Sequence, residues 1–167
     1  MNTMWAPWRM EYIRSPKKKN GCVFCLKNFD SRISAEDTKR LVVYKGKFVY
    51  VMLNRYPYAA GHLLVIPYRH CMDLADLLEE ERNEFMEVIN LSCKAIRKVC
   101  QPDGINMGIN LGKAAGAGIS EHLHGHLVPR WEGDSQFIAV VADVRLIPER
   151  LETMQKTFAL AFKEIID

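Results

Sequence analysis

The chain has 167 residues, of which 49% are hydrophobic and 26% are charged, and its formal net charge at pH 7 is +3. A chain of this length can bury one substantial core, so we expect a single domain over residues 1–167. The charge is too small to require a nucleic-acid partner, and no stretch approaches the length of a membrane span. Since the five cysteines form no regular framework and the N-terminus lacks the apolar core of a secretion signal, we expect a cytoplasmic protein with no membrane partner.

The first part of the chain predicts an arm followed by strands. Residues 1–40 are rich in loop-forming residues and contain the sequence CVFC, which indicates a peripheral N-terminal arm. Two runs of β-branched and aromatic residues, 41–44 and 48–53, meet around Gly46 and predict a hairpin. After a polar loop, the sequence GHLLVIP at residues 61–67 predicts a third strand.

The second part predicts helix, strands and helix. From Asp73 onward apolar residues recur every three or four positions, which predicts a long amphipathic helix that ends at the sequence PDG. A fourth strand is expected at about residues 106–111, a histidine-bearing strand follows, and a second helical pattern lies near the C-terminus. This order predicts an α+β fold, a meander of antiparallel strands with helices on one side. We assign the core sheet and helix to residues 41–130 and a C-terminal extension to residues 131–167.

Three of the five histidines, His122, His124 and His126, lie at alternate positions in the sequence SEHLHGHLVPRW. Alternate side chains of a strand share one face, so the three imidazoles are expected together, with the first and third about 13 Å apart. One metal ion would not reach both ends, although His122 and His124 could converge on one ion. The other interpretation divides their roles: a neutral imidazole is a good nucleophile near pH 7, and the middle histidine is the natural choice.

A small-residue loop, NLGKAAGAGIS, comes directly before these histidines. Gly112, Gly116 and Gly118 permit positive φ, so successive N–H groups could form an anion-binding nest. It is not a Walker loop, because no Gly-Lys-Ser/Thr sequence follows it. Such a loop alone is more often a plain turn, but its place beside three histidines favours a phosphate site.

The sequence HLHGHLV, residues 122–128, resembles the signature of the histidine triad (HIT) family, in which three histidines alternate with apolar residues. Gly125 stands at one of the apolar positions, which would thin the packing behind the strand. The sequence LNRYPYAAGHLLVIPYRH, residues 53–70, resembles the second family signature. The flanking sequences WAPWRMEYI, PRWEGDSQF and DVRLIPE are similar to the bacterial, diadenosine-tetraphosphate phosphorylase-like branch of the family, so the resemblance covers most of the chain.

The resemblance implies a HIT-like fold and a role for each site residue. His124 would be the nucleophile that takes an AMP group onto its ring nitrogen, and His126 would contact the phosphate or assist the leaving group. Asn54 would bind the ribose. The α-phosphate would be held by Asn110 and by the backbone of four loop residues, Gly116, Ala117, Gly118 and Ile119.

Cys22 and Cys25 form a Cys-x-x-Cys pair, which in a reducing compartment is a metal knuckle, a redox motif or two chance thiols. No thioredoxin-like strand precedes the pair, which weakens the redox interpretation. A tetrahedral zinc site needs two more ligands, and His70 and His122 are available at positions that resemble the structural zinc site of zinc-bearing family members. Four protein ligands would leave no open position, so this zinc would be structural. His62 is expected to hydrogen-bond backbone near the histidine strand.

Together with these residues, the resemblance implies a nucleotidyl transferase or hydrolase that acts on adenine nucleotides, such as dinucleoside polyphosphates, through a covalent nucleotidyl-histidine intermediate. Inorganic phosphate as the acceptor would give phosphorolysis and ADP, whereas water would give hydrolysis and AMP, and the sequence does not decide between them. Zinc is the one cofactor expected, with no organic cofactor. Family members are commonly homodimers, so a second copy of the chain is the expected protein partner.

Two other functions fit parts of the sequence. A regulatory protein of the same fold would bind purine nucleotides with little turnover. A zinc-dependent nucleic-acid-binding module is suggested by the Cys-x-x-Cys pair and by Lys17–Lys19, and it would bind oligonucleotides in a salt-sensitive way. The sparse basic charge, which is not interleaved with aromatic residues, disfavours this second alternative.

Overall fold

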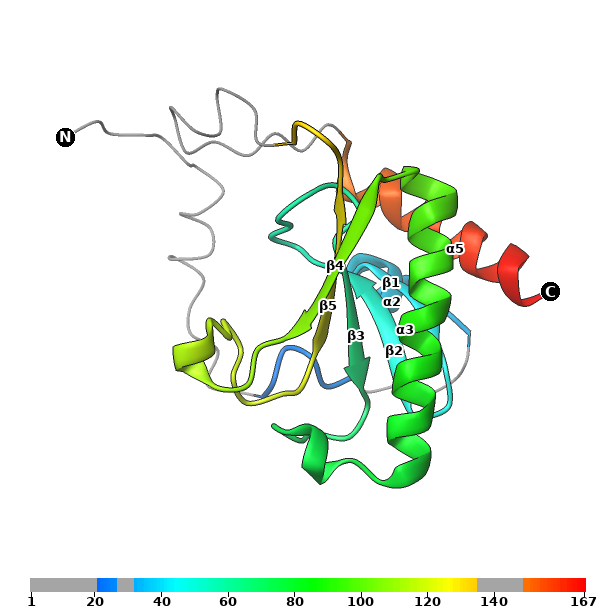
Figure 1. Cartoon of the computed structure of the whole chain (residues 1–167). Coiled ribbons are helices and arrows are strands. Elements are labelled where there is room, and N and C mark those ends of the chain that lie inside the picture. The colour runs from blue at the N-terminus through cyan, green and yellow to red at the C-terminus, as the bar shows by residue number, and fades with distance from the viewer. Residues whose placement is uncertain (1–20, 27–31, 135–148) are drawn as a thin grey trace.

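The computed structural model describes residues 21–26, 32–134 and 149–167 (Figure 1). Lys17–Lys19, the sequence WAPWRMEYI, the last three residues of PRWEGDSQF and all but the last residue of DVRLIPE lie outside the described residues. In the described part, no helix is both long enough and apolar enough to cross a membrane.

The first three strands form the meander that the sequence predicts. β1 (Val42–Lys45), β2 (Val49–Leu53) and β3 (Leu63–Pro67) pair antiparallel in this order. The turn between β1 and β2 is closed by the N–H of Gly46, which donates to the carbonyl of Val49 at 2.8 Å. The predicted hairpin and the predicted third strand are therefore confirmed.

The last two strands join the sheet in a different order. β4 (Gly104–Ile109) begins two residues before the predicted start and pairs antiparallel with β5 (Gly125–Arg130). β5 also pairs antiparallel with β3, so the order across the sheet is β1-β2-β3-β5-β4. β5 thus lies inside the five-stranded sheet and β4 forms an edge (Figure 1).

The long helix is shorter than its periodicity predicts. α3 spans Glu79–Cys100 and begins six residues after Asp73. Asp73 instead caps a separate 3₁₀ turn, Leu74–Asp76, by accepting the N–H of Ala75 at 3.0 Å. Leu77 then takes an extended conformation with ψ of 138°, which separates the turn from the helix.

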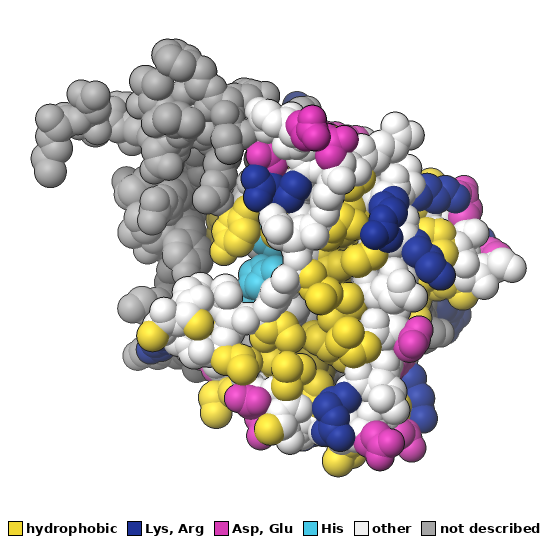
Figure 2. All heavy atoms as spheres, in the orientation of Figure 1, with side chains coloured by type: hydrophobic (Ala, Val, Ile, Leu, Met, Phe, Trp, Pro, Cys, Tyr) yellow, Lys and Arg dark blue, Asp and Glu magenta, His cyan; other side chains and the backbone are white. Residues whose placement is uncertain are grey.

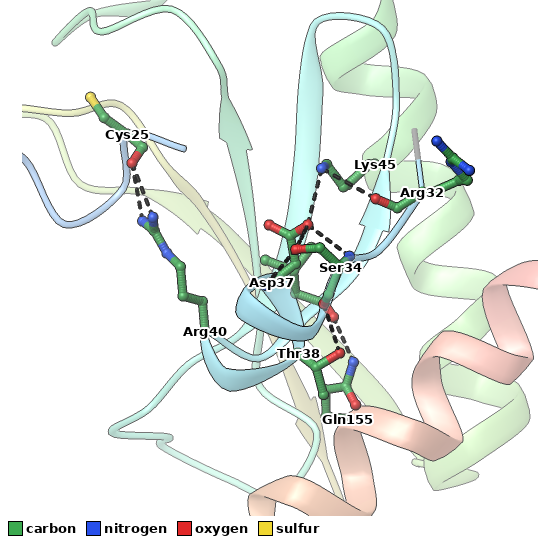
Figure 3. Close-up of polar contacts among 9 residues, drawn as sticks. Cys25, Arg32, Ser34, Asp37, Thr38, Arg40, Lys45 and Gln155 are labelled. Carbon is green, nitrogen blue, oxygen red and sulfur yellow. Dashed lines mark hydrogen bonds and ion pairs between the residues drawn. The ribbon is translucent and has the colours of Figure 1, made fainter. Parts of the chain in front are cut away.

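The two other helices lie near the ends of the described chain. α2 (Ala35–Lys39) is a short helix inside the segment predicted as a loop-rich arm, and Ser34 caps it by accepting the N–H of Asp37. Lys45 of β1 donates to the carboxylate of Asp37 at 3.1 Å in a buried ion pair that joins this helix to the sheet (Figure 3). α5 (Leu151–Ile166) is the predicted C-terminal helix.

The sheet has a different cover on each face. The main core lies between the sheet and the helices α3 and α5, and α5 contributes Met154, Phe158 and Phe162 to it. Gln155 of α5 also donates to the carbonyl of Val42 at 2.7 Å, in a buried contact with β1 (Figure 3). A second apolar cluster contains Phe24, Leu26, Val42, Tyr50, Leu64 and Ile66, so the segment with the two cysteines packs against side chains of β1, β2 and β3.

Candidate active site and metal centre

The histidine segment is a strand only in its second half. β5 begins at Gly125, so the prediction that one strand carries all three histidines is wrong. The pairing of β3 with β5 stops at Val65 and Gly125, and β3 ends at Pro67, which has no N–H to continue the ladder. The carbonyl of Pro67 accepts from Nε2 of His122 at 2.8 Å instead, so a side chain takes the place of the next strand contact.

His124 is fixed in one tautomer by the backbone. Its Nδ1 lies 2.8 Å from the carbonyl oxygen of His122. Because a carbonyl can only accept, Nδ1 must carry the proton, and Nε2 keeps its lone pair. The side chain is only 5% exposed, and this burial lowers the pKa of His124. The structure therefore holds a neutral imidazole with its unprotonated nitrogen directed away from the backbone contact.

His126 is fixed by another histidine. Nδ1 of His62 accepts the N–H of Tyr58 at 3.1 Å, so Nε2 of His62 carries the proton and donates to Nδ1 of His126 at 2.9 Å. Neutral His126 must then carry its proton on Nε2. That atom is buried and has no hydrogen-bond partner among the described residues. Burial, with a smaller contribution from His124, lowers the pKa of His126 to about 4.

The two imidazoles therefore offer complementary nitrogens. The rings of His124 and His126 lie with their centroids 4.9 Å apart, at an angle of 60°. His124 supplies a lone pair and His126 supplies an N–H. Histidine side chains reach the surface in a hollow on the molecular face drawn in Figure 2.

His62 makes the backbone contact that the sequence predicts, but its contact with His126 was not predicted. The position depends on Gly61, whose φ is +78° and which could not carry a Cβ, because that atom would lie 2.5 Å from Sγ of Cys100. His62 is itself completely buried. No sequence pattern signals this contact, since it depends on how β3 and β5 are aligned.

Asn54 lies beside this pair. Its Oδ1 accepts the N–H of Tyr56 at 2.9 Å, and its amide nitrogen lies 3.3 Å from Nδ1 of His62. Both donors near that nitrogen, the amide of Asn54 and the backbone of Tyr58, keep it in the acceptor state. Asn54 therefore contacts His62, which in turn donates to His126.

Gly125 is not a weak point behind the strand. An added Cβ at this residue would lie 3.1 Å from Cζ of Phe85, a core residue of α3. The aromatic ring thus occupies the space that an apolar side chain would take. The expected thinning of the packing is wrong because α3 fills it.

The small-residue loop has less free backbone than the sequence predicts. Gly112 and Gly116 have positive φ, whereas Gly118 does not. The N–H groups of Gly116 and Ala117 donate to carbonyls within the loop, those of Lys113 at 3.0 Å and Gly112 at 3.4 Å. These two N–H groups could bind an anion only after their hydrogen bonds within the loop had broken.

Other members of the predicted phosphate site lie near the loop. A Cβ at Gly116 would lie 3.8 Å from the amide nitrogen of Asn110, so these two residues are neighbours. Ile119 packs against the cluster that contains Phe24. The binding roles of Asn110 and of residues 116–119 stay predictions.

Four side chains, Cys22, Cys25, His70 and His122, form a group that could hold a metal ion, with one ligand atom from each and all four within 4.8 Å of one another. Nδ1 of His122 lies 3.3 Å from Sγ of Cys22, and Nδ1 of His70 lies 3.4 Å from Sγ of Cys25. A tetrahedral ion with zinc–ligand bond lengths would separate sulfur and nitrogen by about 3.6 Å. The donor set therefore fits a zinc ion in size as well as in chemistry.

A further contact prepares His122 for this role. Its Nε2 donates to the carbonyl of Pro67, which leaves Nδ1 unprotonated and directed to the two sulfurs. A hydrogen bond from the second ring nitrogen is the usual support of a metal-bound histidine. The four residues predicted as ligands are thus brought together, and His122 is set apart from the other two histidines of the segment.

Comparison with known proteins places this geometry in a family. The family model described as the HIT domain matches residues 35–133. The AP-4-A phosphorylase of Mycobacterium tuberculosis is 39% identical over 162 residues, which cover 95% of this chain and 83% of that protein. The chain belongs to the HIT family.

Two other relatives show how far the likeness extends. The bis(5'-adenosyl)-triphosphatase of Saccharomyces cerevisiae is 34% identical over 92 residues, which cover 54% of this chain and 44% of that protein. The crystal structure of a zinc-bound histidine triad family protein from Mycobacterium smegmatis superposes with a TM-score of 0.62 and 31% identity, and covers 75% of this chain and 86% of that one. The α+β fold expected from the sequence is therefore confirmed.

Proposed function

We propose that this protein is a nucleotidyl transferase or hydrolase that acts on adenine nucleotides, with dinucleoside polyphosphates as the substrate class. The observation that carries the proposal is the fixed tautomer of His124, whose Nδ1–H is bound to the carbonyl of His122 while Nε2 keeps a lone pair. A buried neutral imidazole in this state can attack phosphorus without first losing a proton. The relatives named AP-4-A phosphorylase and bis(5'-adenosyl)-triphosphatase support the substrate class.

The first step forms a bond between Nε2 of His124 and the α-phosphorus of the substrate. The bond from this phosphorus to the bridging oxygen breaks, and the oxygen leaves with its electron pair and the remaining phosphates. His126 can donate its Nε2–H to an oxygen of the reacting group, because His62 holds the proton on that nitrogen. His124 and His126 are thus the catalytic residues of the proposal.

The second step transfers the nucleotide from His124 to an acceptor. An anionic oxygen of inorganic phosphate, or the oxygen of water with loss of one proton to solvent, attacks phosphorus, and the bond to Nε2 breaks and returns its electron pair to the ring. Phosphate gives ADP and water gives AMP. Asn54 is proposed to bind the ribose, and Asn110 with the backbone of the loop Gly116, Ala117, Gly118 and Ile119 is proposed to hold the α-phosphate.

Zinc is proposed as a structural ion bound by Cys22, Cys25, His70 and His122. The fit of the donor set and the zinc-bound relative support this assignment. With four protein ligands the ion has no open position for water, so it stabilises the fold and takes no part in the chemical steps.

A homodimer joined along β4 is proposed as the assembly. β4 is an edge strand, and Met107 near its centre, which is paired with Leu127 of β5, is 58% exposed. Hydrophobic side chains also gather on the face drawn in Figure 2. We further propose that residues 1–167 form one HIT-like domain and that the protein is cytoplasmic, where adenine nucleotides are abundant and thiols such as Cys22 stay reduced.

The direct test is incubation with diadenosine tetraphosphate, with and without inorganic phosphate, followed by identification of the products. ADP that forms only with phosphate would identify a phosphorylase, and AMP that forms without phosphate would identify a hydrolase. Tight binding of AMP with no turnover would contradict the enzymatic proposal and favour a regulatory nucleotide-binding protein.

His124→Ala tests the nucleophile. The turnover of the variant should fall by a factor on the order of 1,000 or more, as is typical when a covalent nucleophile is removed. AMP binding, measured by calorimetry, should stay within a few fold of the wild type, since the backbone contacts are untouched. Retained turnover would reject the assignment.

A further inference from the structure

We propose that Phe24, the residue just before the second cysteine of the metal knuckle, is a positioning residue that couples metal binding to the reactive imidazole of His124. The inference rests on the proposed function, in which His124 is the nucleophile. It adds a role for the ion, which would then hold the nucleophile in place through one aromatic side chain as well as stabilise the fold.

The contacts of Phe24 place it between the two centres. Its ring lies 4.9 Å from the ring of His124, centroid to centroid, at an angle of 52°, and 5.8 Å from the ring of His122 at 86°. Its side chain is only 5% exposed. Phe24 therefore touches the proposed nucleophile and a proposed metal ligand at the same time.

The backbone of Phe24 is tied to the knuckle. Its N–H donates to Sγ of Cys22 at 3.4 Å, and its carbonyl accepts from the hydroxyl of Tyr50 at 2.5 Å. Arg40 fixes both flanks, because its guanidinium donates to the carbonyls of Val23 and Cys25. Figure 3 shows this arginine extending from the end of α2 to the carbonyl of Cys25.

These contacts restrict how His124 can move. Its Nδ1–H is held by the carbonyl of His122, and its ring contacts the rings of Phe24 and His126. The ring of Phe24 fills the space beside the imidazole, so it limits rotation of the His124 side chain. The metal ligands fix the loop that carries Phe24, so loss of the ion should loosen this aromatic contact and let Nε2 of His124 depart from the position needed for attack. Small displacements of a reacting atom have large effects on rate.

The first test observes the imidazole directly, without turnover. Protein labelled with ¹³C in its histidine rings is studied by NMR, and the resonances of His124 are identified from their absence in His124→Ala. Removal of the metal with a chelator should shift these resonances in the wild type, and added Zn²⁺ should reverse the shift. In Phe24→Leu, where the aromatic ring is absent, the shift on metal removal should be less than half as large. An unchanged wild-type resonance, or an equal shift in the variant, would overturn the proposal.

The second test measures turnover of diadenosine tetraphosphate. Phe24→Ala should lower kcat about tenfold or more while KM changes less than threefold, and Phe24→Leu, which keeps apolar bulk, should recover kcat to within about threefold of the wild type. Metal removal should lower kcat in the wild type but change it less than twofold in Phe24→Ala. Val23→Ala is the matched control in the same loop, because this side chain is 57% exposed, and it should behave as the wild type.

The outcomes separate the two proposals. A rise in KM with unchanged kcat in Phe24→Ala would show that Phe24 contacts only the substrate and would overturn its positioning role. Absence of turnover in the wild type would overturn the proposed function alone, because the NMR test would still report whether the metal and Phe24 hold the ring of His124. If Phe24→Ala does not fold, Phe24→Leu and the chelator arms decide the question by themselves.

Discussion

The contact between His62 and His126 provides the sharpest test of the tautomers in this site. His62→Leu keeps much of the side-chain volume but removes both ring nitrogens. The contacts of its ring nitrogens with the N–H of Tyr58, the amide of Asn54 and Nδ1 of His126 would then be lost, and all three lie in a partly buried region. A buried hydrogen bond that is lost in this way costs about 1–3 kcal/mol, so we expect a loss of about 3 kcal/mol in the free energy of unfolding.

The effect on catalysis follows from the proton of His126. Without the donor of His62, nothing in the described site prevents His126 from moving its proton to Nδ1, and Nε2 would then face the substrate as a lone pair. Loss of a positioned proton donor typically lowers a rate by 10²–10⁴, and we expect kcat of His62→Leu to fall by about 100-fold. Steady-state turnover and chemical denaturation measure the two effects.

His62→Gln is the matched variant, because its amide can still donate to His126. We expect it to keep kcat within about tenfold of the wild type, as expected when one hydrogen bond is preserved with imperfect geometry. If the Leu and Gln variants lose activity equally, or if His62→Leu stays within twofold of the wild type, then the tautomer of His126 does not depend on His62 and the assignment fails.

Three further predictions test other parts of the structure. Because burial lowers the pKa of His126 to about 4 in the folded state, against about 6.5 in the unfolded chain, the unfolded state binds the extra proton first as pH falls through 6.5. Wild-type stability should therefore decrease by about 2 kcal/mol more than that of His126→Asn between pH 7 and pH 5 in urea denaturation, and parallel curves would contradict this. Cys25→Ser should bind zinc well below one ion per chain in a colorimetric release assay, whereas full occupancy would exclude this thiol as a ligand. Gly125→Ala should lower the free energy of unfolding by about 1–3 kcal/mol, because its Cβ would lie 3.1 Å from Phe85, and an unchanged melting midpoint would show that the ring can move.

The sequence was sufficient where local patterns determine the structure. Alternating and β-branched residues located β1, β2 and β3, and spacing located α3 and α5. The four metal-site residues were also predicted, and they come together. This prediction needed the family resemblance, because His70 lies 45 residues from Cys25 in the chain and spacing alone does not bring them together.

The errors arose where distant residues decide a local conformation. The start of β5 depends on Pro67 of the neighbouring strand, whose carbonyl binds the ring of His122. The space beside Gly125 is filled by the ring of Phe85, which lies on α3, 40 residues earlier in the chain. The contact of His62 with His126 depends on strand alignment. Periodicity within a single segment contains no information about such partners.

The packing of α5 has a consequence for how the chain folds during synthesis. The matched HIT domain ends at residue 133, but Met154, Phe158 and Phe162 of α5 complete the core on the sheet. This helix leaves the ribosome after the sheet, so until then the apolar side chains of β1 and β2 that it covers would remain in water. A fragment cut at the family boundary would carry every histidine of the site and still expose the surface that makes nascent sheets aggregate.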